Sequence, residues 1–196
     1  WWLAACRETL EEAGILLAAD ATIDGNGADG TDTIARMRAE LAADESVFGD
    51  LLLAEGIVLD ATLVEEVARF ITPPGPPRRF DARFFIAQAP PGQEPSHDEG
   101  EIVNWDWVRP GDALHRWADG DMAMMSPTVR MVACLARYHS VGEAMAVARR
   151  RLEYQRVRVA DPAAEYRVLL PGEPGYEEAD LEVESGWVRL WNPDLS

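Results

Sequence analysis

The sequence predicts an α/β protein, because segments with the 3.6-residue period of helices alternate with segments typical of strands. The helical period is clearest near the start of the chain, where Leu3, Cys6 and Leu10 form an apolar stripe. Strand character is strongest over 79–88, which carries three phenylalanines and lies between two proline-rich turns. A chain of 196 residues can bury one sizeable core, and we expect one main domain over 1–152.

The first expected element is an acidic helix that would pack on a sheet through its apolar stripe. Glu8, Glu11 and Glu12 stand at i, i+3 and i+4 and therefore share the opposite face. Close carboxylates repel one another by roughly a few tenths of a kcal/mol per exposed pair, so this face gains little unless a cation binds there. Arg7 is expected to offset part of the repulsion by reaching Glu11 one turn on.

A strand and a helical insertion are expected after the acidic helix. Gly14 supplies the left-handed position that ends the helix, and 15–17 begins a buried strand. A loop rich in Gly and Asp follows. Apolar residues then return at helical spacing behind a cap at Thr31 or Asp32, which predicts an insertion over about 33–56 between two core strands.

Three further strands are expected, at 67–72, 79–88 and 102–108. The last of them alternates so that Trp105 and Trp107 share one side. These two indoles are expected to be core residues, with a base-stacking platform as the alternative.

The second half of the main domain is expected to be mostly helical. Helices are predicted to begin at Pro110, behind an N-cap at Ser126 with proline at the first helical position, and after the capping box that Ser140 opens. The remaining segment, 153–196, alternates like strands around a Pro- and Gly-rich turn. We expect a small C-terminal β appendage there, or part of a homodimer surface.

Composition narrows the partners and the compartment. The formal net charge of −17 argues against a nucleic-acid backbone or an anionic membrane as partner. All 18 basic residues are Arg, which suits phosphate recognition, although a GC-rich bacterial genome is the simpler interpretation. Cys6 and Cys134 fall on apolar helical faces, so buried thiols are expected. Without an apolar run of roughly 20 residues or a leader, a bacterial cytoplasmic protein is expected.

Residues 7–15, with the sequence RETLEEAGI, resemble the second half of the signature of Nudix hydrolases. That signature ends in Arg-Glu-apolar-x-Glu-Glu-x-Gly-apolar, and all five fixed positions match. Such a match arises by chance in about one chain of this length in a few thousand. Thr9 departs from the apolar preference. The first half of the motif, a glycine and a further glutamate, would lie before Trp1, and so would the N-terminal strands of the fold.

The resemblance extends to the helical insertion and to three later segments, 71–73, 78–85 and 105–110. Together they look like the branch of the family that includes the peroxisomal coenzyme A diphosphatase of animals. The resemblance implies an α/β/α sandwich with a mixed sheet and a bound Mg²⁺ or Mn²⁺. It also implies hydrolysis of a diphosphate bond in a small nucleoside diphosphate conjugate, with coenzyme A or an acyl-CoA preferred over ADP-ribose or NADH.

The family pattern assigns roles to the acidic helix. Glu8, Glu11 and Glu12 would be the metal ligands, and Arg7 would orient a glutamate. Glutamate oxygens are hard donors that suit Mg²⁺ and Mn²⁺. Cleavage of a diphosphate bond also needs neutralised phosphate oxygens and a water from which a base takes the proton.

Two candidates for the base precede the strand that carries Trp105. We favour Glu101 and then Glu99, although either can equally be a solvated loop acid. Arg78 and Arg79 follow a proline turn at a strand start, where guanidinium groups can bind phosphate in bidentate fashion. Pairing with nearby carboxylates is the alternative for both arginines.

Three functions therefore remain open at this point. The first is a metal-dependent diphosphatase, and the second is a Nudix-fold module that binds or senses a nucleotide without cleaving it. The third is a structural acidic interaction domain, which would have no affinity for metal. The complete set of Glu8, Glu11 and Glu12 favours the enzyme.

Overall fold

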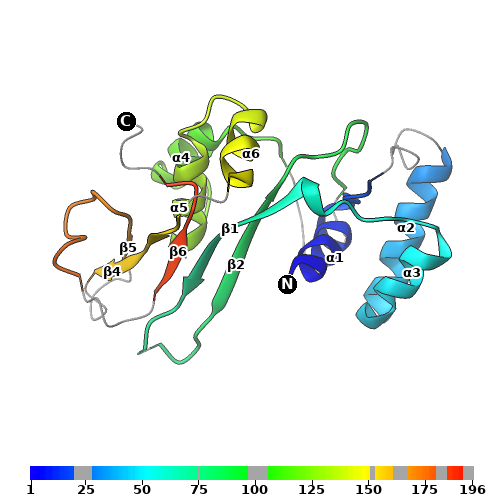
Figure 1. Ribbon diagram of the computed structural model, residues 1–196, viewed down its shortest axis with the longest axis horizontal. Coiled ribbons are helices and arrows are strands. Elements are labelled where there is room, and N and C mark those ends of the chain that lie inside the picture. Colours follow the sequence, from blue (N-terminus) through cyan, green and yellow to red (C-terminus); the bar gives the residue numbers. More distant parts are fainter. Residues whose placement is uncertain are drawn as a thin grey trace. The chain divides into compact units, whose positions relative to one another are not determined.

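The computed structural model describes residues 1–19, 28–74, 76–96, 106–150, 153–160, 167–179 and 185–191, which form two compact units. The first unit comprises 1–64 and 87–107, and the second comprises 65–86 and 108–196. Figure 1 shows the elements of each unit. None of the helices in the described ranges combines the length and the apolar character that crossing a bilayer requires.

The first unit is helical in its described part. Its elements are α1 (Trp2–Ala13), α2 (Ala28–Ala43), the 3₁₀ turn η2 (Glu45–Val47), α3 (Phe48–Ala54) and the 3₁₀ turn η3 (Ala61–Leu63). The second unit contains almost all of β1 (Val64–Ile71) and β2 (Asp81–Ala87), followed by α4 (Pro110–Ala118), α5 (Ser126–Leu135), α6 (Val141–Arg149), β3 (Gln155–Arg156), β4 (Arg158–Ala160), β5 (Arg167–Leu169) and β6 (Gly186–Val188).

Helix α1 has the predicted end, whereas its predicted apolar stripe is buried only in part because Leu3 is 50% exposed. Cys6 and Leu10 are buried, and the chain leaves the helix at Gly14, whose φ of 65° lies in the left-handed region. The Gly14 amide donates to the Leu10 carbonyl oxygen at 3.0 Å. A glycine adopts this backbone conformation without the steric cost that a Cβ would add.

The strand predicted at 15–17 is wrong, although these residues are buried as expected. The chain here makes a single isolated bridge, between Ala18 and Leu59. The reason is the side chain of Gln93. Its Oε1 accepts from the Leu16 amide at 2.8 Å, and its Nε2 donates to the Leu16 carbonyl oxygen at 3.0 Å. One buried amide group thus satisfies the two backbone groups that a neighbouring strand would otherwise pair with.

The helical insertion is present and consists of α2, η2 and α3. Helix α2 begins at Ala28, so the predicted cap at Thr31 or Asp32 is wrong. The cap that the structure does contain is Asp44, whose carboxylate accepts from the Ser46 amide at 2.9 Å at the start of η2. Of the predicted apolar face, Ile34, Met37, Leu41 and Leu51 are buried. Val47 is only half-buried and Ala54 is exposed, because Phe48 fills the core at this point instead.

The sheet of the second unit has the strand order β2-β1-β6-β3. Strand β6 pairs antiparallel with both β1 and β3, with Ala68 opposite Val188. Strands β4 and β5 form a separate antiparallel pair. Every strand pairing whose register is described is antiparallel. The mixed sheet that the family resemblance implies would also contain parallel pairs.

The predicted strands are found in part. Strands β1 and β2 confirm the predictions at 67–72 and 79–88. The strand predicted at 102–108 falls mostly outside the described residues, and its described part, 106–108, is not in a strand. The segment 153–196 was expected to form a separate appendage, yet its strand β6 belongs to the four-stranded sheet.

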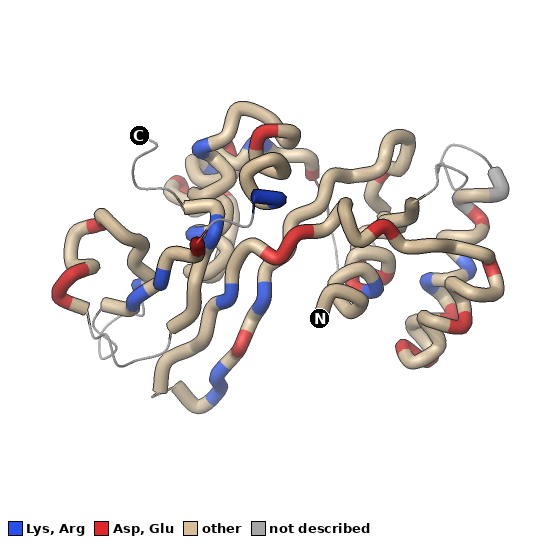
Figure 2. The backbone as a smooth tube through the Cα atoms, in the orientation of Figure 1, with Lys and Arg blue, Asp and Glu red and all other residues tan. Residues whose placement is uncertain are grey.

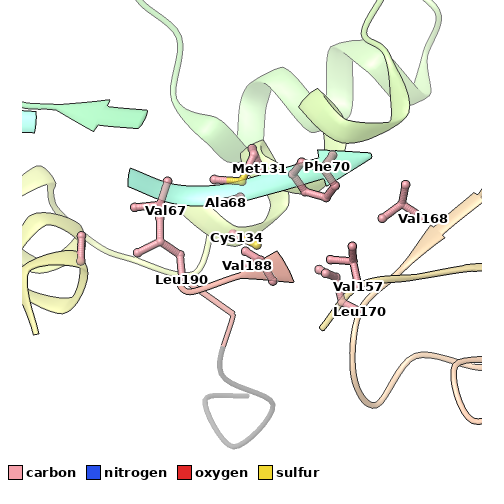
Figure 3. Close-up of a cluster of buried hydrophobic side chains, with 11 residues drawn as sticks. Val67, Ala68, Phe70, Met131, Cys134, Val157, Val168, Leu170, Val188 and Leu190 are labelled. Carbon is pink, nitrogen blue, oxygen red and sulfur yellow. The ribbon is translucent and has the colours of Figure 1, made fainter. Parts of the chain in front are cut away.

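The core of the second unit lies between this sheet and helices α5 and α6. Val67, Phe70 and Val188 from β1 and β6 cluster with Met131 and Cys134 of α5, as Figure 3 shows. Both helices were predicted, and the Ser140 hydroxyl caps α6 by accepting from the Glu143 amide at 3.1 Å. The predicted N-cap at Ser126 is wrong, because α5 begins at Ser126 and its N-cap is Met125, without a side-chain hydrogen bond. This core holds β1 and β2 in place, and Arg78 and Arg79 lie on the connection between these two strands.

Candidate functional site

Arg7 is the centre of the acidic face on α1. Its Nη1 lies 2.8 Å from Glu11 Oε2, and its Nη2 lies 2.6 Å from Glu8 Oε1. The Arg7 side chain is only 18% exposed, so these ion pairs lie partly away from water. The predicted contact between Arg7 and Glu11 is therefore present, and Glu8 shares it. One guanidinium holds two of the three predicted metal ligands.

A third carboxylate on Arg7 comes from the helical insertion. Glu45, in η2, places its Oε2 2.6 Å from Arg7 Nη1. Nothing in the sequence indicated this contact, because it depends on how the insertion packs against α1 and not on local spacing. Three carboxylates thus share one cation, and this group of side chains keeps a net negative charge.

The insertion also binds the C-terminal end of α1 through Arg38. Arg38 Nε and Nη2 both donate to the Glu11 carbonyl oxygen, at 2.9 and 2.7 Å, and Nη1 donates to Ser96 Oγ at 2.9 Å. A cation at the last carbonyls of a helix is favourable because those oxygens carry the negative end of the helix dipole. Arg38 therefore stabilises the helix turn that carries Glu11 and Glu12, and the sequence alone did not indicate this role.

The chemistry of the donors suits a hard divalent cation. Glu8, Glu11 and Glu12 are on one exposed or partly exposed helix face, and Mg²⁺ is usually held by one or two carboxylates together with water and phosphate oxygens. No group of three or more His, Cys, Asp or Glu side chains is gathered into a metal cage in the part of the chain that the structure describes. A cation would compete with Arg7 for Glu8 and Glu11, since the guanidinium occupies oxygens of both.

The other predicted site residues are distributed differently. Arg78 and Arg79 belong to the second unit, where both are exposed, and Arg79 Nε donates to the Thr72 carbonyl oxygen at 2.8 Å. Glu99 and Glu101 lie outside the described residues, so the assignment of the base stays a prediction.

The expectation that Trp105 and Trp107 are core residues fails for Trp107. Its side chain is 63% exposed. Its Nε1 lies 3.4 Å from Glu94 Oε2. The indole is exposed because the chain at 106–108 is not part of a sheet that could bury it. Trp105 lies outside the described residues.

The two cysteines are buried and unpaired with each other, as predicted. Burial raises the pKa of the Cys6 thiol to about 11 and that of the Cys134 thiol to about 12. Both thiols are therefore protonated at neutral pH. A protonated, buried thiol is a poor nucleophile and a poor metal ligand, so neither cysteine is a candidate for the site.

Comparison with known proteins identifies the family. A family model of the NUDT19 Nudix domain matches residues 1–135, which include α1 and the insertion. The chain belongs to this Nudix family. Hydrolases of the Nudix family generally use divalent metal ions. Figure 2 shows where the acidic and basic residues lie along the backbone of each of the two compact units.

Named relatives agree with this assignment. The chain is 27% identical over 159 residues to the acyl-coenzyme A diphosphatase NUDT19 of Gallus gallus, across 72% of this chain and 42% of that protein. It is 29% identical over 130 residues to the putative nudix hydrolase 7 of Caenorhabditis elegans, across 65% of this chain and 41% of that protein. The chain thus spans less than half the length of these two relatives.

A solved structure supports the fold. The crystal structure of a Nudix hydrolase from Alicyclobacillus acidocaldarius superposes with a TM-score of 0.61 at 29% identity, covering 74% of this chain and 64% of that chain. The Nudix-like α/β fold predicted from the motif is therefore confirmed.

Proposed function

We propose that this Nudix domain hydrolyses the diphosphate bond of a nucleoside diphosphate conjugate, and that coenzyme A or an acyl-CoA is the substrate. The observation that carries the proposal is the acidic face of α1, on which Glu8 and Glu11 are held by Arg7 within the segment that matches the Nudix domain. The choice of coenzyme A is supported by the name of the Gallus gallus relative, an acyl-coenzyme A diphosphatase.

In this proposal Glu8, Glu11 and Glu12 hold Mg²⁺ or Mn²⁺. When bound, such an ion neutralises phosphate oxygens and lowers the pKa of a coordinated water. Arg7 orients Glu8 and Glu11 through the ion pairs described above, and Glu45 helps to fix Arg7 by pairing with the same Nη1 that contacts Glu11. Arg38 keeps the last turn of α1 in place.

The remaining roles belong to residues of the loops. Glu101, or failing it Glu99, takes the proton of the attacking water. Arg78 and Arg79 bind phosphate oxygens, for which a guanidinium offers two parallel N–H donors. The Nε of Arg79 is already used by the Thr72 carbonyl oxygen, which leaves its terminal nitrogens for this purpose.

A second candidate function is nucleotide binding without catalysis. It is favoured by one observation, that Arg7 engages oxygens of both Glu8 and Glu11 and so competes with any cation. A sensor of this kind would bind a nucleotide conjugate in the presence of Mg²⁺ and leave it intact.

One incubation separates these possibilities. The protein is mixed with Mg²⁺ and, separately, with coenzyme A, octanoyl-CoA, ADP-ribose and NADH, and phosphomonoester products are measured by chromatography. We expect phosphomonoesters from coenzyme A or octanoyl-CoA at a higher kcat/KM than from the other two, and none when EDTA replaces Mg²⁺. Binding without product would establish the sensor, and a preference for ADP-ribose or NADH would contradict the substrate assignment.

A further inference from the structure

We infer that a cavity in the second unit binds the acyl chain of an acyl-CoA-like substrate. The inference rests on the proposed function, which supplies the anionic headgroup. The cavity has a volume of about 450 Å³, within the range of small-molecule sites in proteins. It lies among the ends of β1 and β2, the first turn of α5, and the pair β4 and β5, all within the second unit.

The floor of the cavity is apolar and buried. Phe70 is 4% exposed and Val168 is 8% exposed, and Phe84 packs edge-to-face on Phe70 with ring centroids 5.3 Å apart. Phe80 and Met125 extend the same apolar surface outwards, at 57% and 69% exposure. A chain of methylene groups would cover these two exposed side chains, and removal of such surface from water is favourable.

The polar groups of the lining are few, and two of them are already hydrogen-bonded. Ser185 Oγ donates to the Val157 carbonyl oxygen at 2.6 Å, and Thr72 Oγ1 accepts from the Phe80 amide at 3.0 Å. A nucleobase carries several donors and acceptors, and each one left unpaired in an apolar cavity weakens binding. An aliphatic chain has none, so it suits this lining better than an adenine ring does.

Arg78 adds a cation to the wall of the cavity, and the anionic part of an acyl-CoA is the diphosphate to which the acyl chain is joined through the pantetheine arm. Arg78 is exposed, and it has no hydrogen-bond or ion-pair partner among the residues that the structure describes. Arg79, the next residue, is instead held by the Thr72 carbonyl oxygen. An apolar cavity with a guanidinium in its wall, unpartnered within the described residues, matches a ligand with an aliphatic part and an anionic part.

The test measures affinity as a function of acyl length. Coenzyme A, butanoyl-CoA and octanoyl-CoA are titrated into the 196-residue chain by calorimetry in EDTA, so that no hydrolysis interferes. Each methylene that enters the cavity should lower the Kd about fourfold until the cavity is full.

Two alanine-to-phenylalanine substitutions test whether the acyl chain lies in the cavity. Ala82 lines the cavity on β2, and Ala82→Phe fills part of its volume. Ala87 is an exposed residue at the end of the same strand, and its odd-numbered position puts it on the opposite face, so Ala87→Phe is the matched control. Ala82→Phe should abolish the dependence on acyl length, and Ala87→Phe should preserve it.

A third variant keeps the inference testable if Ala82→Phe does not fold, which circular dichroism would reveal. Phe80→Gln removes apolar surface at the exposed end of the cavity without adding charge, and it should reduce the gain from butanoyl-CoA to octanoyl-CoA severalfold. Equal affinity for all lengths in the wild type overturns the inference, and so does an unchanged length dependence in folded Ala82→Phe and Phe80→Gln.

Two further outcomes are informative. Octanoate that binds as tightly as octanoyl-CoA would show a fatty-acid site and overturn the assignment to a conjugate.

Failure of this inference is also distinct from failure of the proposed function. A protein that cleaves coenzyme A with Mg²⁺ but shows no length dependence refutes the acyl site alone, whereas length-dependent binding without cleavage refutes the hydrolase alone.

Discussion

Gly14 shows how one residue sets the geometry of the acidic helix. Its φ of 65° ends α1 immediately after Glu11 and Glu12, and a Cβ at this position would meet Ser96 Oγ and lie 3.3 Å from Arg38 Nη1. Alanine would therefore strain the backbone and also disturb the contact that holds the end of α1.

The chain offers a control for Gly14. Gly56 has the same φ of 65°, but a Cβ there would meet nothing within 4 Å. Gly56→Ala should cost about 1 kcal/mol through backbone strain alone, and Gly14→Ala should cost at least about 1 kcal/mol more in urea denaturation. Equal losses for the two variants would show that Ser96 and Arg38 do not constrain this turn.

The base is a second question at the scale of single residues. Because Glu101 directly precedes the segment of Trp105, we expect Glu101→Gln to lower kcat by about 10²-fold or more while KM changes little. Steady-state kinetics with coenzyme A and Mg²⁺ measure both constants. Loss of turnover in Glu99→Gln alone would move the role to Glu99, and full turnover in both variants would exclude both residues.

At the scale of elements, the helical insertion is a support for α1. Arg38 of α2 donates to the Glu11 carbonyl oxygen, and Glu45 of η2 pairs with Arg7. Hydrogen bonds from a charged donor contribute roughly 1.5–3 kcal/mol when partly buried, so Arg38→Gln should lower the free energy of unfolding by about 1–3 kcal/mol.

Arg36 is the matched control for Arg38. It lies on the same helix and pairs with Glu40 and Glu55, but its side chain is 46% exposed. Exposed pairs contribute about 0.2–1 kcal/mol, so Arg36→Gln should cost less than Arg38→Gln in the same denaturation experiment. The reverse order would contradict a supporting role for the insertion.

An ion pair across β1 and β2 makes a prediction about pH. Hydrogen bonds from Arg69, at 2.6 and 2.7 Å, lower the pKa of the Asp81 carboxyl below its usual 3.8. A carboxyl whose pKa is lower in the folded state stabilises the fold above its unfolded pKa of about 3.9, and this contribution disappears as the pH falls through the folded pKa.

Asp81→Asn should therefore cost about 0.2–1 kcal/mol at pH 7, since the pair is partly exposed, and progressively less below about pH 4. Urea denaturation at several pH values measures the difference. Asp121→Asn, which removes an exposed carboxylate without an ion pair in the described part of the chain, should show no such trend. A cost for Asp81→Asn that is the same at pH 7 and pH 3 would contradict the pair's contribution.

At the scale of the whole molecule, what the sequence could predict was set by the range of the interactions. The common face of Glu8 and Glu11 and the left-handed turn at Gly14 depend on residues within one or two helix turns, and both are present. The contacts of Gln93, Arg38 and Glu45 join distant segments, and no local pattern could indicate them.

The C-terminal segment also depends on long-range contacts. Its alternating pattern correctly indicated strands, but pattern alone cannot tell which strand is the neighbour, and β6 pairs with β1 from the middle of the chain. The cavity lined by Phe84 could not be predicted from the sequence either, because its wall combines residues from β1, β2, α5, β4 and β5. Family membership could be predicted from the sequence because the signature of residues 7–15 is contiguous, and the family model over 1–135 confirms it.

The central claim is that the acidic face of α1 binds a divalent cation, and calorimetric titration with Mn²⁺ tests it most directly. We expect one site whose affinity falls by about tenfold or more in Glu11→Gln and in Glu12→Gln, since each substitution removes a charged hard ligand. Glu40→Gln, which removes an exposed carboxylate of α2, should bind Mn²⁺ like the wild type. Unchanged affinity in both Glu11→Gln and Glu12→Gln, or no Mn²⁺ binding by the wild type, would contradict the claim.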